Sequence, residues 1–260
     1  MTELIPDVVY AAHGGLSLAL DVLRPDPPPA APMPLVVEIH PGAWMFGGKH
    51  AERNRFLVTR GFCTASIDYR LSTQARFPAQ IEDARAAVQF LRSRAEEFGI
   101  DPARVGVWGE SSGGHLAALL GASGDGNAPG SHGRAPGGLA TVQAVAAVSA
   151  PADLALLGNE YVPPLLGGPA EEREELAAQA SPLSYLPGTG PLPPFLIIHG
   201  DSDTQVPPDH ADLLDSALRE AGADVEYISL PEGHNLLGSA SAETVRSHLA
   251  RFFTRHLTPA

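Results

Sequence analysis

The sequence contains a single cysteine, Cys63, so it can form neither an intrachain disulfide nor a cysteine-rich metal site. Cys63 lies in an apolar run, and we expect it to be a small buried side chain. No stretch of 18 or more apolar residues occurs, which excludes a transmembrane helix. The first residues also lack the basic and apolar regions of a secretory signal. We therefore expect a soluble, cytoplasmic protein.

Positive charge is scarce. The chain has 17 lysines and arginines against 30 aspartates and glutamates, and its formal net charge is −13. Because a negative surface repels phosphates and anionic lipids, we expect no nucleic acid and no membrane as a partner. The sequence also lacks an H-E-x-x-H motif, and its histidines and acids do not follow metal-ligand spacings. No metal and no cofactor is expected.

The N-terminal third predicts one hairpin and one loop. Alternating segments at residues 8–12 and 16–23 flank Gly14-Gly15, which predicts an antiparallel pair of strands. The proline-rich stretch 24–34 predicts a surface connection that is neither a helix nor a central strand. With 44% hydrophobic residues, the chain can bury one core, so we expect residues 1–260 to form a single domain.

Beyond the prolines, short apolar runs alternate with amphipathic segments. The runs predict strands at residues 35–40, 63–69, 105–108, 142–149, 195–199 and 225–230, and the segments predict helices at 51–60, 79–98, 112–122, 208–221 and 242–256. This alternation predicts an α/β fold with a mostly parallel, doubly wound sheet covered on both faces. The glycine-rich segment 124–138 and the acidic segment 153–187 interrupt it. We expect them to form small rim or cap elements and no large lid.

A candidate nucleophile lies at Ser111, in the sequence Gly-Glu-Ser-Ser-Gly between an apolar run and an alanine-rich helix. This G-x-S-x-G pattern is typical of a sharp strand-to-helix turn that exposes its serine, and side chains at Gly109 or Gly113 would collide with the neighbouring elements. The amide of Ser112 is placed to stabilise an oxyanion. A glycine-rich turn without chemistry is the alternative.

The small-residue loop after the strand at 35–40 is a second candidate element. Gly42 and Ala43 could donate backbone amides to an oxyanion, whereas Pro41 has no N–H to donate. His40 could act as a base or line the substrate pocket, although a hydrogen bond that fixes the loop is the favoured interpretation. Trp44 either lines the pocket or packs beneath it.

The acid and the base are predicted in two later loops. Asp203 lies deeper than Asp201 in the polar loop after the strand at 195–199, so it is the preferred partner for an imidazole. His234 lies in a glycine-flanked loop after the last strand and suits proton transfer near neutral pH. Of the other histidines, His210 is expected at the surface. The order Ser111, Asp203, His234 is the chain order typical of α/β-hydrolases.

These motifs resemble the α/β-hydrolase superfamily, within it the esterase/lipase branch that includes hormone-sensitive lipase and the BD-FAE group of feruloyl and acetyl-xylan esterases. The loop at residues 40–44, the turn at 109–117 and the acid loop at 199–207 carry the resemblance, which extends over about residues 35–236. It implies a Ser111–His234–Asp203 triad and an oxyanion hole formed by Gly42, Ala43 and Ser112. The chain departs from the family pattern at Pro41, where glycine is usual.

The expected function is that of a serine carboxylesterase that hydrolyses short-chain or aryl esters of small molecules through an acyl-enzyme. The sequence leaves open whether the protein is a monomer or a homodimer. An aryl-formamidase or a small peptidase or amidase on the same fold is an alternative, although peptidases of this type usually carry an added propeller. A non-catalytic ligand-binding homologue is a further alternative, and the retention of all three triad residues argues against it.

Overall fold

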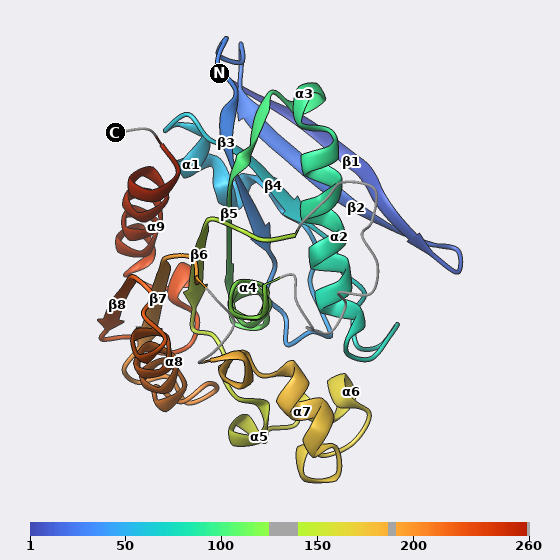
Figure 1. Cartoon of the computed structure of the whole chain (residues 1–260), viewed down its shortest axis with the longest axis vertical. Coiled ribbons are helices and arrows are strands. Elements are labelled where there is room, and N and C mark those ends of the chain that lie inside the picture. The colour runs from blue at the N-terminus through green and yellow to red at the C-terminus, as the bar shows by residue number, and fades with distance from the viewer. Residues whose placement is uncertain (125–139, 187–190, 259–260) are drawn as a thin grey trace.

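The computed structural model describes residues 1–124, 140–186 and 191–258. Within them, one sheet has the strand order β1-β2-β4-β3-β5-β6-β7-β8 (Figure 1). The strands are β1 (Thr2–His13), β2 (Leu16–Pro25), β3 (Met33–Ile39), β4 (Cys63–Ile67), β5 (Ile100–Glu110), β6 (Ala144–Val148), β7 (Phe195–Gly200) and β8 (Val225–Leu230). The β1–β2 and β2–β4 pairs are antiparallel and all other pairs are parallel. The predicted α/β architecture is confirmed.

The N-terminal hairpin turns at Gly14-Gly15, and both glycines have positive φ (56° and 95°). The predicted hairpin is therefore confirmed, although its strands are longer than the alternation suggested. The prediction that 24–34 contains no central strand is wrong at both ends, because Arg24 and Pro25 end β2 and Pro34 is the second residue of β3. The pairing of β3 with β5 is irregular between Met33 and Leu35, so the missing N–H of Pro34 falls where the ladder is interrupted.

Helices cover both faces of the sheet. The core on one face includes side chains of α2 (Ala79–Ser93), α4 (Ser112–Ser123) and α8 (Asp209–Glu220), and the core on the other face includes those of α1 (Arg55–Val58) and α9 (Ala242–Leu257). Two predicted helices are broken. Residues 51–60 form the 3₁₀ turn η1 (Ala51–Asn54) and the short α1, and residues 79–98 divide at Arg94 into α2 and α3 (Ala95–Phe98). Left-handed Gly99 ends α3 at the predicted point.

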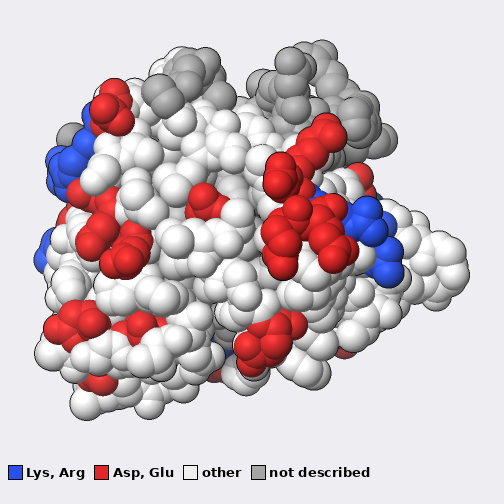
Figure 2. Space-filling model, turned by 90° about the horizontal axis from the view of Figure 1, so that it is seen from below, with Lys and Arg blue, Asp and Glu red and all other residues white. Residues whose placement is uncertain are grey.

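The acidic segment forms short helices at the carboxyl ends of the parallel strands (Figure 1). They are α5 (Leu154–Leu157), α6 (Val162–Leu166) and α7 (Glu174–Ala180), with the 3₁₀ turns η2 (Ala170–Glu172) and η3 (Pro182–Tyr185). Figure 2 shows this end from below, where acidic side chains gather and basic ones lie near the edges. The other predicted insertion, 124–138, lies outside the described residues beyond Gly124. None of the described helices is long and apolar enough to cross a membrane.

The turn from β5 into α4 allows no side chain at its glycines. A Cβ on Gly113 would lie 2.0 Å from the carbonyl oxygen of Ile39, and one on Gly109 would lie 2.3 Å from the carbonyl carbon of Gly113. Real Cβ atoms do not approach backbone this closely. The turn between them is consequently pressed against the end of β3, which brings two loops of the sheet edge together.

Gly113→Ala should lower the free energy of unfolding by at least about 2 kcal/mol, because neither the helix nor β3 can move away from the added methyl group. Urea denaturation measures this loss. The matched control is Gly233→Ala, where a Cβ meets nothing within 4 Å; we expect a change within about 0.5 kcal/mol. Equal stability of the two variants would contradict a close contact between α4 and β3.

His115 is a fully buried polar side chain on α4. Its Nδ1 accepts a hydrogen bond from Trp44 Nε1 at 3.1 Å, and its Nε2 donates to the carbonyl oxygen of Ala180 at 2.7 Å. Burial, aided by the nearby His210, lowers the pKa of His115 to about 4. The imidazole is therefore neutral in the folded protein at neutral pH.

This burial should make stability pH-dependent. Between pH 6.5, the ordinary pKa of the group, and about pH 4, the unfolded state binds a proton at His115 that the folded state does not. Stability is therefore lost as the pH falls, by about 2 kcal/mol between pH 7 and pH 5. Urea unfolding at both pH values should show a smaller loss for His115→Asn than for the wild type. An equal loss would show that His115 titrates normally.

Candidate active site

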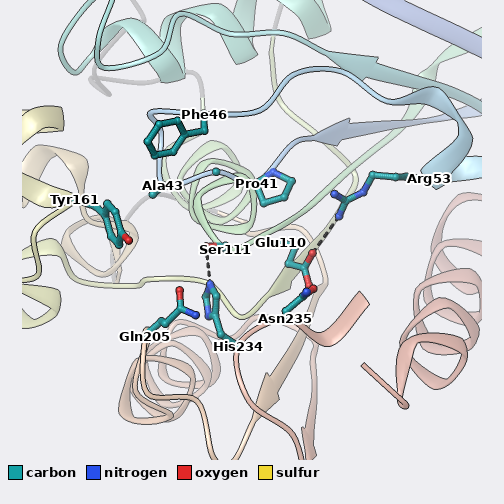
Figure 3. A pocket seen from close by; sticks show the side chains of 11 residues that line it. Pro41, Ala43, Phe46, Arg53, Glu110, Ser111, Tyr161, Gln205, His234 and Asn235 are labelled. Carbon is teal, nitrogen blue, oxygen red and sulfur yellow. Dashed lines mark hydrogen bonds and ion pairs between the residues drawn. The ribbon is translucent and has the colours of Figure 1, made fainter. Parts of the chain in front are cut away.

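Ser111 lies at the tip of the β5–α4 turn in a strained conformation (φ 56°, ψ −123°). Its amide donates to the carbonyl oxygen of Val148, the last residue of β6, at 2.8 Å. Its Oγ caps no helical amide; it lies 2.8 Å from Nε2 of His234 (Figure 3). The turn therefore aims the hydroxyl at an imidazole that is 123 residues away in sequence.

His234 lies in the loop between β8 and the 3₁₀ turn η4 (Leu236–Gly238). Its Nδ1 lies 2.7 Å from Oδ2 of Asp203, and a carboxylate can only accept, so Nδ1 carries the proton and Nε2 is free to accept the hydroxyl hydrogen of Ser111. The loop is tied to the serine turn, because the amide of Leu237 donates to Oε1 of Glu110 at 3.0 Å. The ring is thus aligned at both nitrogens.

Asp203 is buried, with 3% of its surface exposed. Its Oδ1 accepts the amides of Gln205 and Val206, both at 2.9 Å. Burial opposes its charge, but hydrogen bonds from His199 and His234 and from the Val206 amide outweigh that cost and hold the pKa of the carboxyl well below its usual range. Asp203 is therefore ionised at neutral pH.

Asp201, the alternative acid, is exposed, and its Oδ1 accepts a hydrogen bond from the neighbouring Ser202 hydroxyl. No hydrogen bond or ion pair joins it to His234 within the described residues. Of the two aspartates, the structure brings only Asp203 to the imidazole.

The loop after β3 has three consecutive residues with positive φ: Gly42 (132°), Ala43 (51°) and Trp44 (58°). The conformation turns the carbonyl of Gly42 toward the amides of Met45 and Phe46, both at 2.9 Å. Within the described part of the chain, the backbone N–H groups of Gly42 and Ala43 donate no hydrogen bond. Both residues line the cleft beside Ser111.

Ser112 begins α4, where an amide has no acceptor one turn back in the helix. It lines a small hollow together with Ala43 and Ser111. The three predicted oxyanion donors thus flank the serine on two elements.

His40 and Trp44 are both buried, but only Trp44 lines a hollow at the site. His40 is 2% exposed, donates from Nδ1 to the carbonyl oxygen of Pro41 at 2.8 Å and stacks on the ring of Tyr69 with centroids 4.3 Å apart. The assignment of His40 to the substrate pocket is therefore wrong, because burial keeps it behind the loop that it fixes. Trp44 is also 2% exposed and contributes to the wall of the small hollow, and whether substrate enters that hollow stays a prediction.

A cleft of about 450 Å³ opens at Ser111 (Figure 3). Arg53, Glu110 and Asn235 lie on one side of the serine, and Phe46 and Tyr161 lie on the other. Nη2 of Arg53 lies 3.1 Å from Oε2 of Glu110, and Nε of Arg53 lies 3.4 Å from Oε1 of the buried Glu38. Sequence reasoning missed these cleft residues. Only Tyr161, within the predicted rim segment, and Asn235, which follows His234, carried a signal.

The remaining predictions on polar residues have mixed outcomes. Cys63 is buried in β4 as predicted, and burial raises the pKa of its thiol to about 12. His210 was expected at the surface but is 1% exposed, and its Nδ1 accepts the amide of Ala152 at 3.2 Å. Among the described residues, no cluster of three or more histidine, cysteine or acidic side chains could hold a metal ion.

Comparisons with known proteins find relatives that align with nearly all of this chain. The chain is 32% identical over 255 residues to Esterase LipQ and 30% identical over 254 residues to Esterase LipC, both of Mycobacterium tuberculosis; these matches cover 94% and 91% of this chain, and 59% and 62% of those proteins. The chain thus spans about 60% of the length of these curated relatives.

Among solved structures, a truncated carbohydrate esterase from gut microbiota superposes with a TM-score of 0.86 at 28% identity, covering 99% of this chain and 97% of that one. An esterase of the planctomycete Thermogutta terrifontis superposes with a TM-score of 0.81 at 23% identity, covering 99% and 94%, and shows the same fold. The model of the BD-FAE family matches residues 20–218. The mostly parallel sheet, the glycine-bounded turn at Ser111 and this match over most of the sequence show that the chain belongs to the BD-FAE family of α/β-hydrolases.

Proposed function

We propose that the protein is a serine carboxylesterase with Ser111 as nucleophile, His234 as general base and Asp203 as the acid that orients the base. The observation that carries the proposal is the unbroken line of hydrogen bonds from Ser111 Oγ to His234 Nε2 at 2.8 Å and from His234 Nδ1 to Asp203 Oδ2 at 2.7 Å. The names of LipQ and LipC as esterases support it.

In the first half-reaction, the Ser111 hydroxyl passes its proton to Nε2 of His234 while Oγ attacks the ester carbonyl carbon. The carbon–oxygen bond to the alcohol then breaks, and the alcohol leaves with that proton. In the second half-reaction, water gives a proton to the same imidazole and attacks the acyl-enzyme, which releases the acid and restores the serine. The buried carboxylate of Asp203 stabilises the imidazolium that forms in both steps.

Negative charge develops on the carbonyl oxygen in each tetrahedral intermediate. We assign its stabilisation to the amides of Gly42, Ala43 and Ser112, which flank Ser111 on the β3 loop and the first turn of α4. Pro41 precedes these donors and takes no part as a donor. Proline at this position therefore removes none of the three assigned donors.

Ser111→Ala should reduce the turnover of p-nitrophenyl acetate by at least about 10³-fold, because the nucleophile is lost while the oxyanion donors remain. Spectrophotometric release of p-nitrophenol measures the effect. Undiminished turnover would refute the proposal.

The two aspartates of the acid loop supply a matched control. Asp203→Asn should lower kcat by at least about 10²-fold, because an amide does not hold the proton on Nδ1 of His234. Asp201→Asn changes an exposed carboxylate of the same loop and should leave kcat within about 2-fold. An equal loss in both variants would remove Asp203 from the triad.

The acyl side of the site is small. Ala43, Trp44, Ser111 and Ser112 together with Leu157 and other cap residues enclose a hollow of about 30 Å³, enough for one or two water-sized groups. The open cleft of about 450 Å³ on the other side can take an alcohol of varied size. We assign the hollow to the acyl group and the cleft to the alcohol, which gives a preference for acetyl and propionyl esters. The segment 153–186 acts as a small cap of the same domain.

Leu157→Ala should raise the ratio of kcat/KM for p-nitrophenyl butyrate to that for the acetate by about 10-fold or more, because the shorter side chain makes room for two further methylene groups. The adjacent Leu156 is 52% exposed and does not line the hollow, so Leu156→Ala is the control and should change the ratio less than about 2-fold. A ratio unchanged in both variants would place the acyl group elsewhere.

A further inference from the structure

The loop that carries two of the proposed oxyanion donors is held in an unfavourable backbone conformation. Ala43 and Trp44 both have the positive φ that residues with a side chain rarely adopt. The two hydrogen bonds to the Gly42 carbonyl close the loop on itself, but they do not fix the loop relative to Ser111. A strained loop keeps its shape only when contacts outside it determine that shape.

Trp44 supplies those outside contacts. Its carbonyl oxygen accepts the amide of Ser72 at 2.7 Å, and its indole Nε1 donates to Nδ1 of His115 at 3.1 Å. The indole and the imidazole meet edge to face, with centroids 5.1 Å apart and an interplanar angle of 88°. The residue next to the donor Ala43 is therefore anchored at both its backbone and its side chain.

His115 can accept from Trp44 in only one form. The carbonyl oxygen of Ala180, 2.7 Å from Nε2, has no hydrogen to give, so Nε2 must carry the proton. Nδ1 is then unprotonated and receives the indole hydrogen, which Trp44 can only donate. A proton on Nδ1 would set two donors against each other. The neutral Nε2–H imidazole is the form that satisfies all three groups.

The position of His115 joins this contact to the nucleophile. His115 lies one helical turn after Ser111, and its amide donates to the Ser111 carbonyl oxygen at 2.9 Å. The same α4 turn thus carries the nucleophile and the acceptor that holds the loop. The bond to Ala180, the last residue of α7, fixes the ring from the cap side.

We propose that His115 is a positioning residue, which holds the oxyanion loop in register with Ser111 through the indole of Trp44. The proposal rests on the proposed esterase function. It predicts that loss of the Trp44–His115 bond reduces stabilisation of the transition state more than it reduces substrate binding. The reason is that the affected amides act on charge that develops during the reaction.

Two substitutions separate the two bonds of the imidazole. In His115→Asn the side-chain amide reaches the place of Nδ1 and can still accept from Trp44, whereas in His115→Gln it reaches the place of Nε2 and can still donate to Ala180. We expect His115→Gln to lower kcat for p-nitrophenyl acetate about 10- to 100-fold with KM changed less than about 3-fold. His115→Asn should keep kcat within about 3-fold of the wild type.

The double variant with Trp44→Phe tests the route of the effect. Trp44→Phe removes the donor, so adding it to His115→Gln should lower kcat no further than about 2-fold, because both changes remove the same bond. Melting temperatures are measured for all variants. If His115→Asn and His115→Gln lose kcat equally, and the losses parallel the drop in melting temperature, the effect is one of stability and the proposal is overturned. An unchanged kcat in His115→Gln would also overturn it.

The two tryptophans allow a test that needs no turnover. The indole of Trp44 donates to His115, and that of Trp108 donates to Asn54 at 2.9 Å, so Trp108 is an internal reference. In ¹H–¹⁵N spectra, His115→Gln should shift the Trp44 indole signal and speed its hydrogen exchange at least about 10-fold, while the Trp108 signal stays in place. An unshifted Trp44 signal would overturn the proposal even in an active enzyme. A wild-type protein without esterase activity would refute the proposed function. The Trp44 indole signal would still show whether the Trp44–His115 hydrogen bond exists.

Discussion

The close approach of the α4 helix to the end of β3 is the constraint on which the site depends. At Gly113 the helix backbone lies so near the Ile39 carbonyl that no side chain fits between them. β3 and β5 are neighbours in the sheet, so this approach puts the loop that follows β3 beside the turn that follows β5. The proposed nucleophile and two of the proposed oxyanion donors come from segments about 70 residues apart in the sequence, and this contact makes them neighbours.

The sequence was most informative where one residue type is physically required. Gly109 and Gly113 mark a turn that excludes side chains, and Gly14-Gly15 and Gly99 mark positions with positive φ. The fold class followed from the alternation of apolar runs and helices. The chain order of serine, aspartate and histidine predicted which groups would lie together, and the structure brings all three to one line of hydrogen bonds.

Features that depend on tertiary contact could not be predicted in this way. Pro34 enters a central strand because the β3–β5 ladder is irregular at that point, which no local pattern reveals. The cleft residue Arg53 reaches the site only because it pairs with Glu110 and approaches Glu38, two acids of different strands. His210 was misplaced at the surface because it is a polar side chain between Asp209 and Asp212 near the start of α8. Its ring accepts the amide of Ala152, a contact from a residue 58 positions earlier that no local pattern reveals.

The histidines around the site fall into two groups: those that fix loops and the one that is proposed as the base. His40 donates to the Pro41 carbonyl and His199 lies 2.9 Å from that of Val206, so each fixes the loop that follows its own strand. His115 connects the first of these loops to the nucleophile helix. All three rings are at most 2% exposed. Burial lowers the pKa of His40 and of His115, which favours a neutral ring with one donor and one acceptor at these two positions. His234 differs because its side chain is 13% exposed and its ring lies between the Asp203 carboxylate and the Ser111 hydroxyl. Each of the three buried rings bonds a backbone carbonyl, whereas His234 bonds the Ser111 hydroxyl, and this difference separates the histidines that hold loops from the proposed base.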